Sequence, residues 1–422
     1  MSRSLVFRFF LAAFCWCGLT SAVHAIPSSD PDLTEAWRLL RNGQQEELKK
    51  VCIKRLGLQK NLAQWHELLA LALEGKAGAQ AEVKKALAIA PQDEHIIATA
   101  GFLCAHSGNV DATVLRKLDQ CTKLHPENAR CHAAISACYR AMQNSNADAE
   151  LALAIKSDQC DYDVNIEAAQ HYMQKTNGVE TESALERLTK YSPKSANAFF
   201  QRAQFELQSF RLDQACDNFK KATELNPKLP QAYAYWAKTL VKSEKYEQAA
   251  KVLTLMIENG DRSTSTLARR ANCLMHSKQP AKALKDYDAA MNIIDPNHKY
   301  LTPGALHEMS RDARGNYKKY FLNRVECREQ LGQIDQGIKE LNMLIRADPL
   351  FSDSAMDIRQ RLFRKKGLFA MALADLNALI VKDKYIADRY LARAEVLRKL
   401  GREEEAKRDI AHAQNVERTG TP

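Results

Sequence analysis

Apolar residues in the second half of the chain recur with the spacing of an α-helix. A small residue is followed by apolar residues four and seven positions later, as in Ala215, Phe219 and Ala222. The same set begins at the small residues Ala215, Ala249, Ala283, Gly337, Ala372 and Ala406, mostly at intervals of about 34 residues. Positions four and seven apart lie on one face of a helix, so each set predicts an amphipathic helix with one buried side.

A second helix is expected before each of these. When every repeat is numbered so that the small residue is position 20, position 4 holds Phe199, Tyr233, Leu267, Phe321, Met356 and Tyr390. A proline follows three of the helices that begin near position 20, in Asn226-Pro227, Asp295-Pro296 and Asp348-Pro349. The residue before a proline disfavours helix, so these helices should end there. The pattern therefore predicts helix pairs that face each other across a short turn.

The large apolar residue at position 4, the small residues at 8 and 20 and the proline near 32 together resemble the tetratricopeptide repeat family. The resemblance implies an all-α fold, a right-handed α-solenoid of helix-turn-helix repeats. Regular repeats are expected over 196–297 and 318–420, and degenerate helical repeats over 26–195, where Ala86 to Pro91 and Cys121 to Pro126 look like the ends of second helices.

One interval is longer than the others, and residues 298–317 form an insertion between the two regular blocks. Thr302-Pro303-Gly304 predicts a turn, and Ala305 to Asp312 a short helix. Insertions in solenoids often carry function. A tolerated surface loop is the alternative, because extra loop length costs little entropy.

Positions 7 and 23 change together from repeat to repeat. Arg at position 7 accompanies an acid or amide at position 23, whereas Trp236 accompanies the apolar Val252. We expect an ion pair between the two helices of a repeat, with the arginine stem packed and its head neutralised. An anion site is the alternative. The expected pairs are Arg270 with Asp286, Arg324 with Glu340, Arg359 with Asp375, and Arg393 with Asp409.

The first 25 residues have the order of a secretory signal peptide. Arg3 and Arg8 precede an apolar run, which ends in a small-residue stretch with cleavage expected after Ala25 or, alternatively, Ala22. The apolar run is too short to span a bilayer. We therefore expect an exported protein, periplasmic or secreted, with no membrane span after signal removal.

Composition and motifs argue against several classes of function. The net charge is +10, but basic and acidic residues are interleaved, so no nucleic-acid partner is expected. There is no phosphate-binding glycine loop and no hydrolase or metalloprotease motif, so we expect no enzyme, no cofactor and no metal site. A catalytic set assembled across distant repeats is the alternative. The candidates for a disulfide are Cys121 with Cys131 or Cys138.

The resemblance implies that positions 2, 5, 9, 12 and 13 of the first helices line a concave groove. Their mixed charges suit an extended polypeptide, so we predict a protein-protein interaction scaffold of the cell envelope. The expected groove residues are Lys238, Lys242, His276, Lys319, Arg361, Arg364 and Lys365, with Phe200 and Leu322 as apolar anchors. The alternatives are an envelope assembly or secretion accessory factor and a co-chaperone-like carboxylate clamp, which Lys319 and Asn323 match but Glu326 and Ile358 do not.

Overall fold

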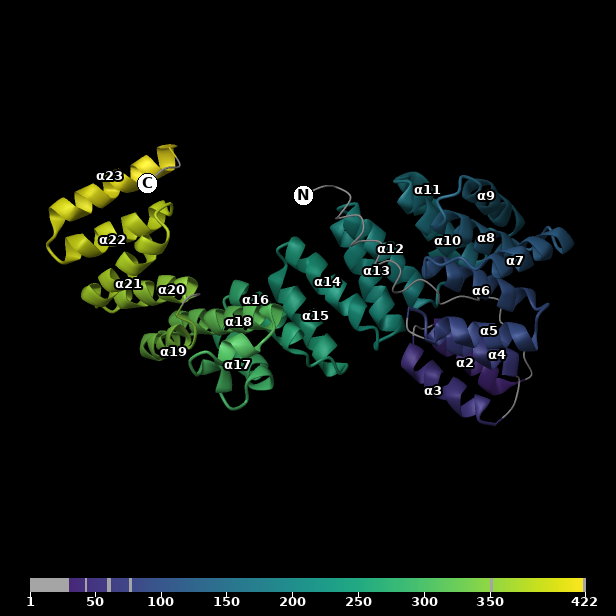
Figure 1. Cartoon of the computed structure of the whole chain (residues 1–422), viewed down its shortest axis with the longest axis horizontal. Helices are drawn as coiled ribbons and strands as arrows, with labels where there is room; N and C mark the ends of the chain where they lie inside the picture. Colours follow the sequence, from purple (N-terminus) through teal and green to yellow (C-terminus); the bar gives the residue numbers. More distant parts are fainter. Residues whose placement is uncertain (1–29, 42–43, 59–61, 76–77, 350–351, 420–422) are drawn as a thin grey trace. The chain divides into compact units, whose positions relative to one another are not determined.

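A computed structural model describes residues 30–41, 44–58, 62–75, 78–349 and 352–419 of the chain. All regular secondary structure in these residues is helical, and Figure 1 shows that successive helices lie side by side. The chain is an all-α repeat solenoid. The signal peptide predicted over residues 1–25 lies outside the described residues.

The chain divides into two compact units. Unit 1 ends at Ser243, and unit 2 begins at Glu244. The division falls within the block 196–297, for which the sequence predicts three regular repeats. Each unit is described separately.

Unit 1 consists of helix pairs in which the first helix packs on the second. The pairs are α2 (Pro31–Arg41) with α3 (Gln45–Leu56), α4 (Leu62–Ala72) with α5 (Ala79–Ile89), α6 (Glu94–His106) with α7 (Ala112–Leu124), α8 (Ala129–Ala141) with α9 (Ala147–Ser157), α10 (Tyr162–Gln174) with α11 (Gly178–Tyr191), and α12 (Ala196–Gln208) with α13 (Leu212–Leu225), and they are followed by α14 (Pro230–Lys242).

Unit 2 continues the pattern. It contains α15 (Tyr246–Glu258), α16 (Thr264–His276) with α17 (Pro280–Ile294), the 3₁₀ turns η1 (Lys299–Leu301) and η2 (Ala305–Glu308), α18 (Arg311–Gln330) with α19 (Ile334–Ala347), α20 (Asp353–Lys365) with α21 (Phe369–Lys382), and α22 (Ala387–Lys399) with α23 (Glu403–Thr419).

Capping residues fix where many first helices begin. Asn128, Asp161, Ser195 and Ser263 each accept a hydrogen bond from a backbone N–H in the first turn of the following helix. Such a cap contributes about 1 kcal/mol, because helix starts leave backbone donors unpaired. In α14, Pro230 at the first turn has the same effect by removing a donor.

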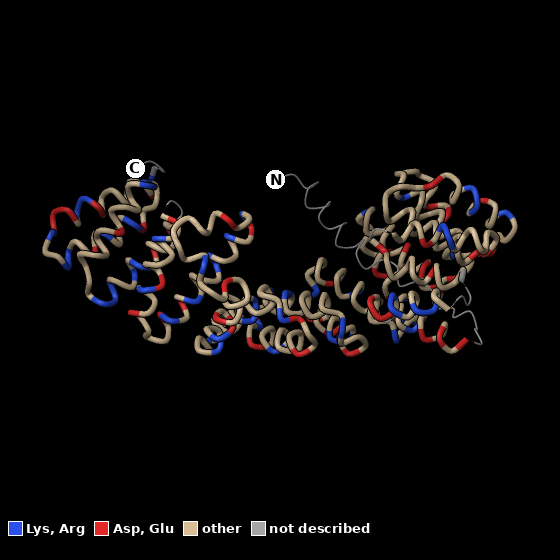
Figure 2. Tube along the Cα trace, turned by 60° about the horizontal axis from the view of Figure 1, so that its bottom comes forward, with Lys and Arg blue, Asp and Glu red and all other residues tan. Residues whose placement is uncertain are grey.

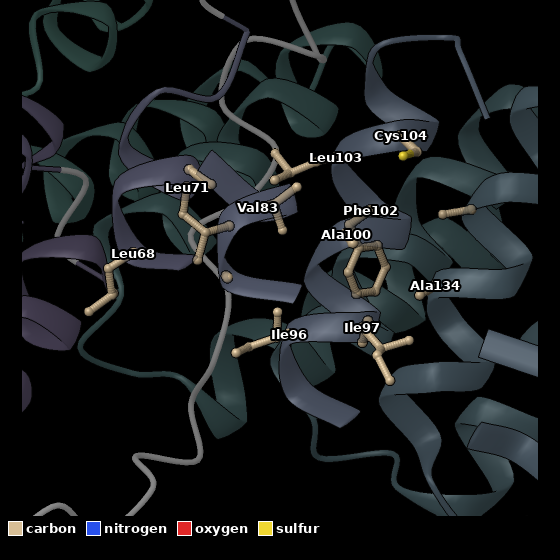
Figure 3. Close-up of a cluster of buried hydrophobic side chains, with 14 of the residues drawn as sticks. Leu68, Leu71, Val83, Ile96, Ile97, Ala100, Phe102, Leu103, Cys104 and Ala134 are labelled. Carbon is tan, nitrogen blue, oxygen red and sulfur yellow. The ribbon is translucent and has the colours of Figure 1, made fainter. Parts of the chain in front are cut away.

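The core of unit 1 depends on close approach between first helices. Figure 3 shows side chains of α4, α5, α6 and α8 packed together, among them Ile97, Phe102 and Ala134. A Cβ added at Gly101 would lie 2.8 Å from Leu118 Cδ1 and 3.1 Å from Ala134 Cβ. A larger residue there would force the Leu118 side chain to move and would crowd Ala134, so glycine allows the close packing seen here.

A polar ladder also links the first helices of unit 1. Thr99 Oγ1 of α6 donates to Glu67 Oε1 of α4 at 2.5 Å, and Arg130 Nη2 of α8 donates to Thr99 Oγ1 at 3.0 Å. Arg130 Nε then donates to Asp163 Oδ2 of α10 at 2.5 Å. All four side chains are buried. Burial raises the pKa of Asp163 to about 6, although the adjacent Arg130 favours its ionised form.

The insertion packs against the protein, and the short helix predicted over Ala305 to Asp312 is correct only in its first half. Residues 305–308 form the 3₁₀ turn η2, and α18 begins at Arg311, so residues 311–317 lengthen the first helix of the next pair. Leu306 is fully buried, and Gly304 N donates to Ala347 O at 3.2 Å. The insertion is therefore not a loose surface loop.

Candidate peptide-binding surface

The arginines at position 7 lie between the two helices of their repeats. Arg270 Nε and Nη2 donate to the two carboxylate oxygens of Asp286 at 2.7 and 2.6 Å. The same two-pronged geometry joins Arg359 to Asp375 and Arg393 to Asp409, and Arg324 Nη2 lies 3.2 Å from Glu340 Oε2. The carboxylates therefore neutralise these arginines inside the repeats.

A third partner comes from the preceding repeat. The Nη1 group of Arg270 donates to Thr254 Oγ1 at 3.2 Å, and the corresponding atoms of Arg359 and Arg393 donate to Asn342 at 2.6 Å and Asn377 at 2.9 Å. These partners all lie five residues after the small residue at position 20. These polar residues at position 25 can be read from the sequence, but their contact with the arginine of the next repeat was not predicted.

Arg202 departs from this scheme. No hydrogen bond joins it to Asn218 among the described residues. Instead, Glu206 bridges the two side chains, accepting from Arg202 Nε at 3.1 Å and from Asn218 Nδ2 at 2.7 Å. The expected partner at position 23 is therefore contacted only indirectly.

The three basic residues predicted for the groove in α20 are paired within the protein. Arg361 donates to both oxygens of Glu329 in α18, at 3.2 and 2.8 Å, and Lys365 Nζ lies 2.7 Å from the same carboxylate. Arg364 pairs with Glu395 in α22. Burial disfavours the charged form of Glu329, but the hydrogen bonds from Arg361 and Lys365 outweigh it and lower its pKa. These cations therefore form ion pairs between neighbouring first helices.

Phe200, predicted as an apolar anchor, is buried, and this prediction is wrong. Its ring packs against Phe219 at 5.9 Å and Tyr235 at 5.8 Å between centroids, and only 1% of the residue is exposed. Aromatic pairs at this separation contribute to the core, so the Phe200 ring is not available to contact a bound protein. Leu322, the other anchor, is half-buried.

The remaining groove candidates are exposed. His276 stacks on Tyr246, with ring centroids 4.4 Å apart, and Lys319 on α18 has no acidic partner among the described residues. Asn323, a residue that matched a carboxylate clamp, donates to Asn272 Oδ1 at 3.1 Å and to Tyr287 Oη at 3.0 Å. Its amide hydrogens are therefore already engaged, which argues against a clamp at this position.

We term five residues of α14 and of the turn between α12 and α13 the α14 surface: the exposed Phe210, Lys238, Val241 and Lys242, and the half-buried Tyr235. Both lysines are exposed, and neither has an acidic partner among the described residues. Lys238 Nζ lies 5.8 Å from the centre of the Tyr235 ring, and Lys242 Nζ lies 5.5 Å from that of Phe210. Aromatic faces attract cations, but they leave the charge uncompensated.

Phe210 is held in an unusual conformation. Its φ is 58°, in the left-handed region, and 79% of the residue is exposed. In the last three helix pairs the equivalent turn residue is glycine, at Gly332, Gly367 and Gly401. A side chain in this region costs about 1 kcal/mol or more, and Phe210 recovers little of that by burial. It was not among the residues predicted from sequence.

The described residues contain no sign of a nucleic-acid, metal or membrane site. Figure 2 shows acidic and basic residues interspersed along both units, with no block of one sign. Within the described ranges, no three His, Cys, Asp or Glu side chains gather closely enough to bind a metal ion. None of the helices that the structure describes combines the length and apolar character needed to cross a membrane.

Comparison with known proteins agrees with the helical repeats. The family model described as Iml2/Tetratricopeptide repeat protein 39 matches residues 131–309. This match covers less than half of the chain, and with the repeat pattern and the helix pairs it shows that the chain is similar to tetratricopeptide repeat proteins. Tetratricopeptide repeat proteins are typically scaffolds that bind proteins or peptides. No curated protein matches the chain.

Several solved structures are similar to the chain. A tetratricopeptide repeat protein from Parabacteroides merdae is 18% identical, with a TM-score of 0.40, over 61% of this chain and 93% of that one. PilF from Pseudomonas aeruginosa is 19% identical, with a TM-score of 0.39, over 49% and 95%. PilW, a type IV pilus biogenesis factor, is 18% identical, with a TM-score of 0.39, over 52% and 92%. We infer no function from these similarities.

Proposed function

We propose that this protein is a non-enzymatic scaffold that binds an acidic, extended segment of another protein at the α14 surface. One observation carries the proposal. Lys238 and Lys242 are exposed cations on a first helix, and no acid of the described residues neutralises them. By contrast, Arg361, Arg364 and Lys365 all have carboxylate partners. A charged partner gains most electrostatic binding energy next to charges that no group of the protein neutralises.

The spacing of the two lysines supports an acidic partner. Lys238 and Lys242 are four residues apart, so they share one face of α14. Two like charges at this spacing repel each other by about 0.2–0.5 kcal/mol in an isolated helix. Carboxylates from a bound segment relieve this repulsion and gain two charge-assisted contacts.

Phe210 and Val241 supply the apolar part of the surface. Phe210 is 79% exposed and Val241 is 38% exposed. Apolar contacts usually provide most of the binding energy at an interface, while charged groups set orientation and specificity. The surface therefore favours a segment in which acidic and large apolar residues lie close together.

The test uses fluorescence anisotropy with a short labelled peptide rich in Glu and Leu. The full chain should bind this peptide more tightly than a counterpart with Lys in place of Glu. The double variant Lys238→Glu with Lys242→Glu should weaken binding at least about tenfold and flatten its salt dependence. The matched control, Lys220→Glu with Lys221→Glu, makes the same charge change on α13. Equal losses in both variants would contradict a site at α14.

A second pair of variants separates binding from backbone strain. Phe210→Gly and Lys278→Gly both relieve a left-handed residue, with φ values of 58° and 57°. Both should stabilise the protein slightly. Only Phe210→Gly should weaken binding of the peptide, because Lys278 lies outside the α14 surface. Unchanged affinity in Phe210→Gly would remove Phe210 from the site.

We also propose that the protein acts after export, in the periplasm or as a secreted protein. The support is the order of basic, apolar and small residues over 1–25. Protein purified from its native host should begin at Ile26, or at Val23 if cleavage follows Ala22. Recovery of the chain with Met1 intact would contradict export.

A further inference from the structure

We propose that Cys121 and Cys131 form a disulfide that joins α7 to α8. Cys121 lies in the last turn of α7, and Cys131 lies in the first turn of α8. Their Sγ atoms are 2.8 Å apart. Sulfur atoms this close need only a small rotation of the side chains to bond, because helix ends on either side of a short turn already hold them together.

The surroundings of the other thiol exclude the alternative pairing. Cys138 Sγ donates to Gly101 O of α6 at 3.4 Å, so it points away from Cys121 and into the contact between first helices. Sequence had left Cys131 and Cys138 as equal candidates for Cys121. The geometry selects Cys131.

The chemistry is a two-electron oxidation by an external disulfide. One thiolate attacks the external disulfide, forms a mixed disulfide and releases one thiol. The second thiolate then attacks the mixed disulfide, forms the Cys121–Cys131 bond and releases the other thiol. Both protein thiols lose their protons, and the external disulfide is reduced to two thiols.

Burial decides when this oxidation can occur. Cys121 is 5% exposed and Cys131 is fully buried. Desolvation raises the pKa of both thiols, so the folded protein holds little of the reactive thiolate. The bond should therefore form while the chain folds, and slowly or not at all after folding in the reduced state.

A Cys121–Cys131 bond would connect two neighbouring repeats. Cys121 belongs to the second helix of one pair, and Cys131 belongs to the first helix of the next. A repeat protein is stabilised mainly by contacts between neighbours. The bond would oppose separation of these neighbours within the degenerate repeats of residues 26–195.

The test is to refold the full chain with reduced and oxidised glutathione and to map its tryptic peptides without reduction. Leu118–Lys123 should be linked to Cys131–Arg140. Because the second peptide also contains Cys138, two variants resolve the partner. The link should remain in Cys138→Ser and disappear in Cys131→Ser. A link that persists in Cys131→Ser, or a folded wild-type chain without any link, would overturn the proposal.

Thermal unfolding provides a second readout. The oxidised chain should melt at a higher temperature than the same chain refolded in reductant, and Cys121→Ser should abolish this difference. Cys216→Ser, in α13, is the matched control and should preserve it. An equal shift in Cys121→Ser and Cys216→Ser would also overturn the assignment. Neither measurement depends on the proposed peptide partner.

Discussion

At the residue scale, an arginine side chain can join three helices when its planar head has partners on several sides. Arg270 of α16 contacts Asp286 of α17 and Thr254 of α15. The guanidinium group offers five donors in a fixed plane, which a lysine could not match. The ion pair predicted within one repeat is thus also a contact between repeats.

This geometry predicts a measurable coupling at Arg270. Arg270→Ala should destabilise unit 2 by about 1–3 kcal/mol, because it leaves a buried carboxylate without its main donors. Adding Asp286→Ala should cost little more, since the contact is already lost. Chemical denaturation of the single and double variants measures the coupling. Fully additive losses would show that the two side chains do not interact.

At the scale of elements, buried polar groups connect the first helices of unit 1. The ladder from Glu67 through Thr99 and Arg130 to Asp163 runs across α4, α6, α8 and α10. A buried hydrogen-bond network is stable only if nearly every polar side chain in it has a partner. The ladder therefore fixes which helices are neighbours as well as holding them together.

Asp163 makes unit 1 sensitive to pH. Its pKa rises from 3.8 to about 6 on folding, so the folded state holds the proton more tightly than the unfolded chain. This contribution to stability is present below about pH 4 and is lost as pH rises through about 6. Urea unfolding at pH 5 and pH 7 should show that loss in the wild type and a smaller one in Asp163→Asn. An identical loss in both proteins would assign the effect to other groups.

The insertion is held by one buried carboxylate. Asp295, at the end of α17, accepts from Lys299 N at 2.7 Å, Tyr300 N at 3.2 Å and Tyr317 Oη at 2.9 Å. Asp295→Ala should destabilise the protein by about 1–3 kcal/mol, because three donors lose their acceptor.

Limited proteolysis measures the local effect of Asp295→Ala. Cleavage near Thr302 to Gly304 should become faster, since the residues before α18 lose their attachment. Lys299→Ala is the control, because it keeps the backbone donor to Asp295 and removes only the exposed ion pair between Lys299 and Glu308. Unchanged cleavage in Asp295→Ala would show that packing of Leu306 holds the insertion instead.

At the scale of the whole molecule, some cations of the first helices are neutralised within the protein and others are not. The chain has 61 Lys and Arg residues and 51 Asp and Glu residues, and the three cations of α20 predicted for the groove pair with Glu329 of α18 and Glu395 of α22. Lys238 and Lys242 of α14 differ from these three cations, because no acid of the described residues pairs with them and their charge remains available to a partner.

Reversal of the charges in α20 should act on stability and not on partner binding. The variant Arg361→Glu, Arg364→Glu and Lys365→Glu places new carboxylates beside Glu329 and Glu395. Unit 2 should lose at least about 1 kcal/mol of stability, while affinity for the Glu- and Leu-rich peptide stays within about twofold. Thermal melting and anisotropy test the two parts. A large loss of peptide affinity with an unchanged melting temperature would show that the peptide binds at α20 and not at α14.

Sequence alone determined the helices and their pairing. The spacing of Ala215, Phe219 and Ala222 specifies one buried helix face, and this information lies within a single turn or two of chain. The covariation of Arg270 with Asp286 also predicted a contact correctly placed within one repeat. Local periodicity sufficed because helix formation and packing within a pair depend on residues close in sequence.

Only the tertiary structure decided which polar and apolar residues remain available. Phe200 and Lys238 both occupy inner positions by pattern, yet Phe200 is buried against Tyr235, and Lys238 is exposed. Arg361 matched the groove pattern equally well, but Glu329 on another helix neutralises it. Exposure and charge compensation arise from side chains that meet across repeats, and repeat periodicity carries no information about which residue will be met.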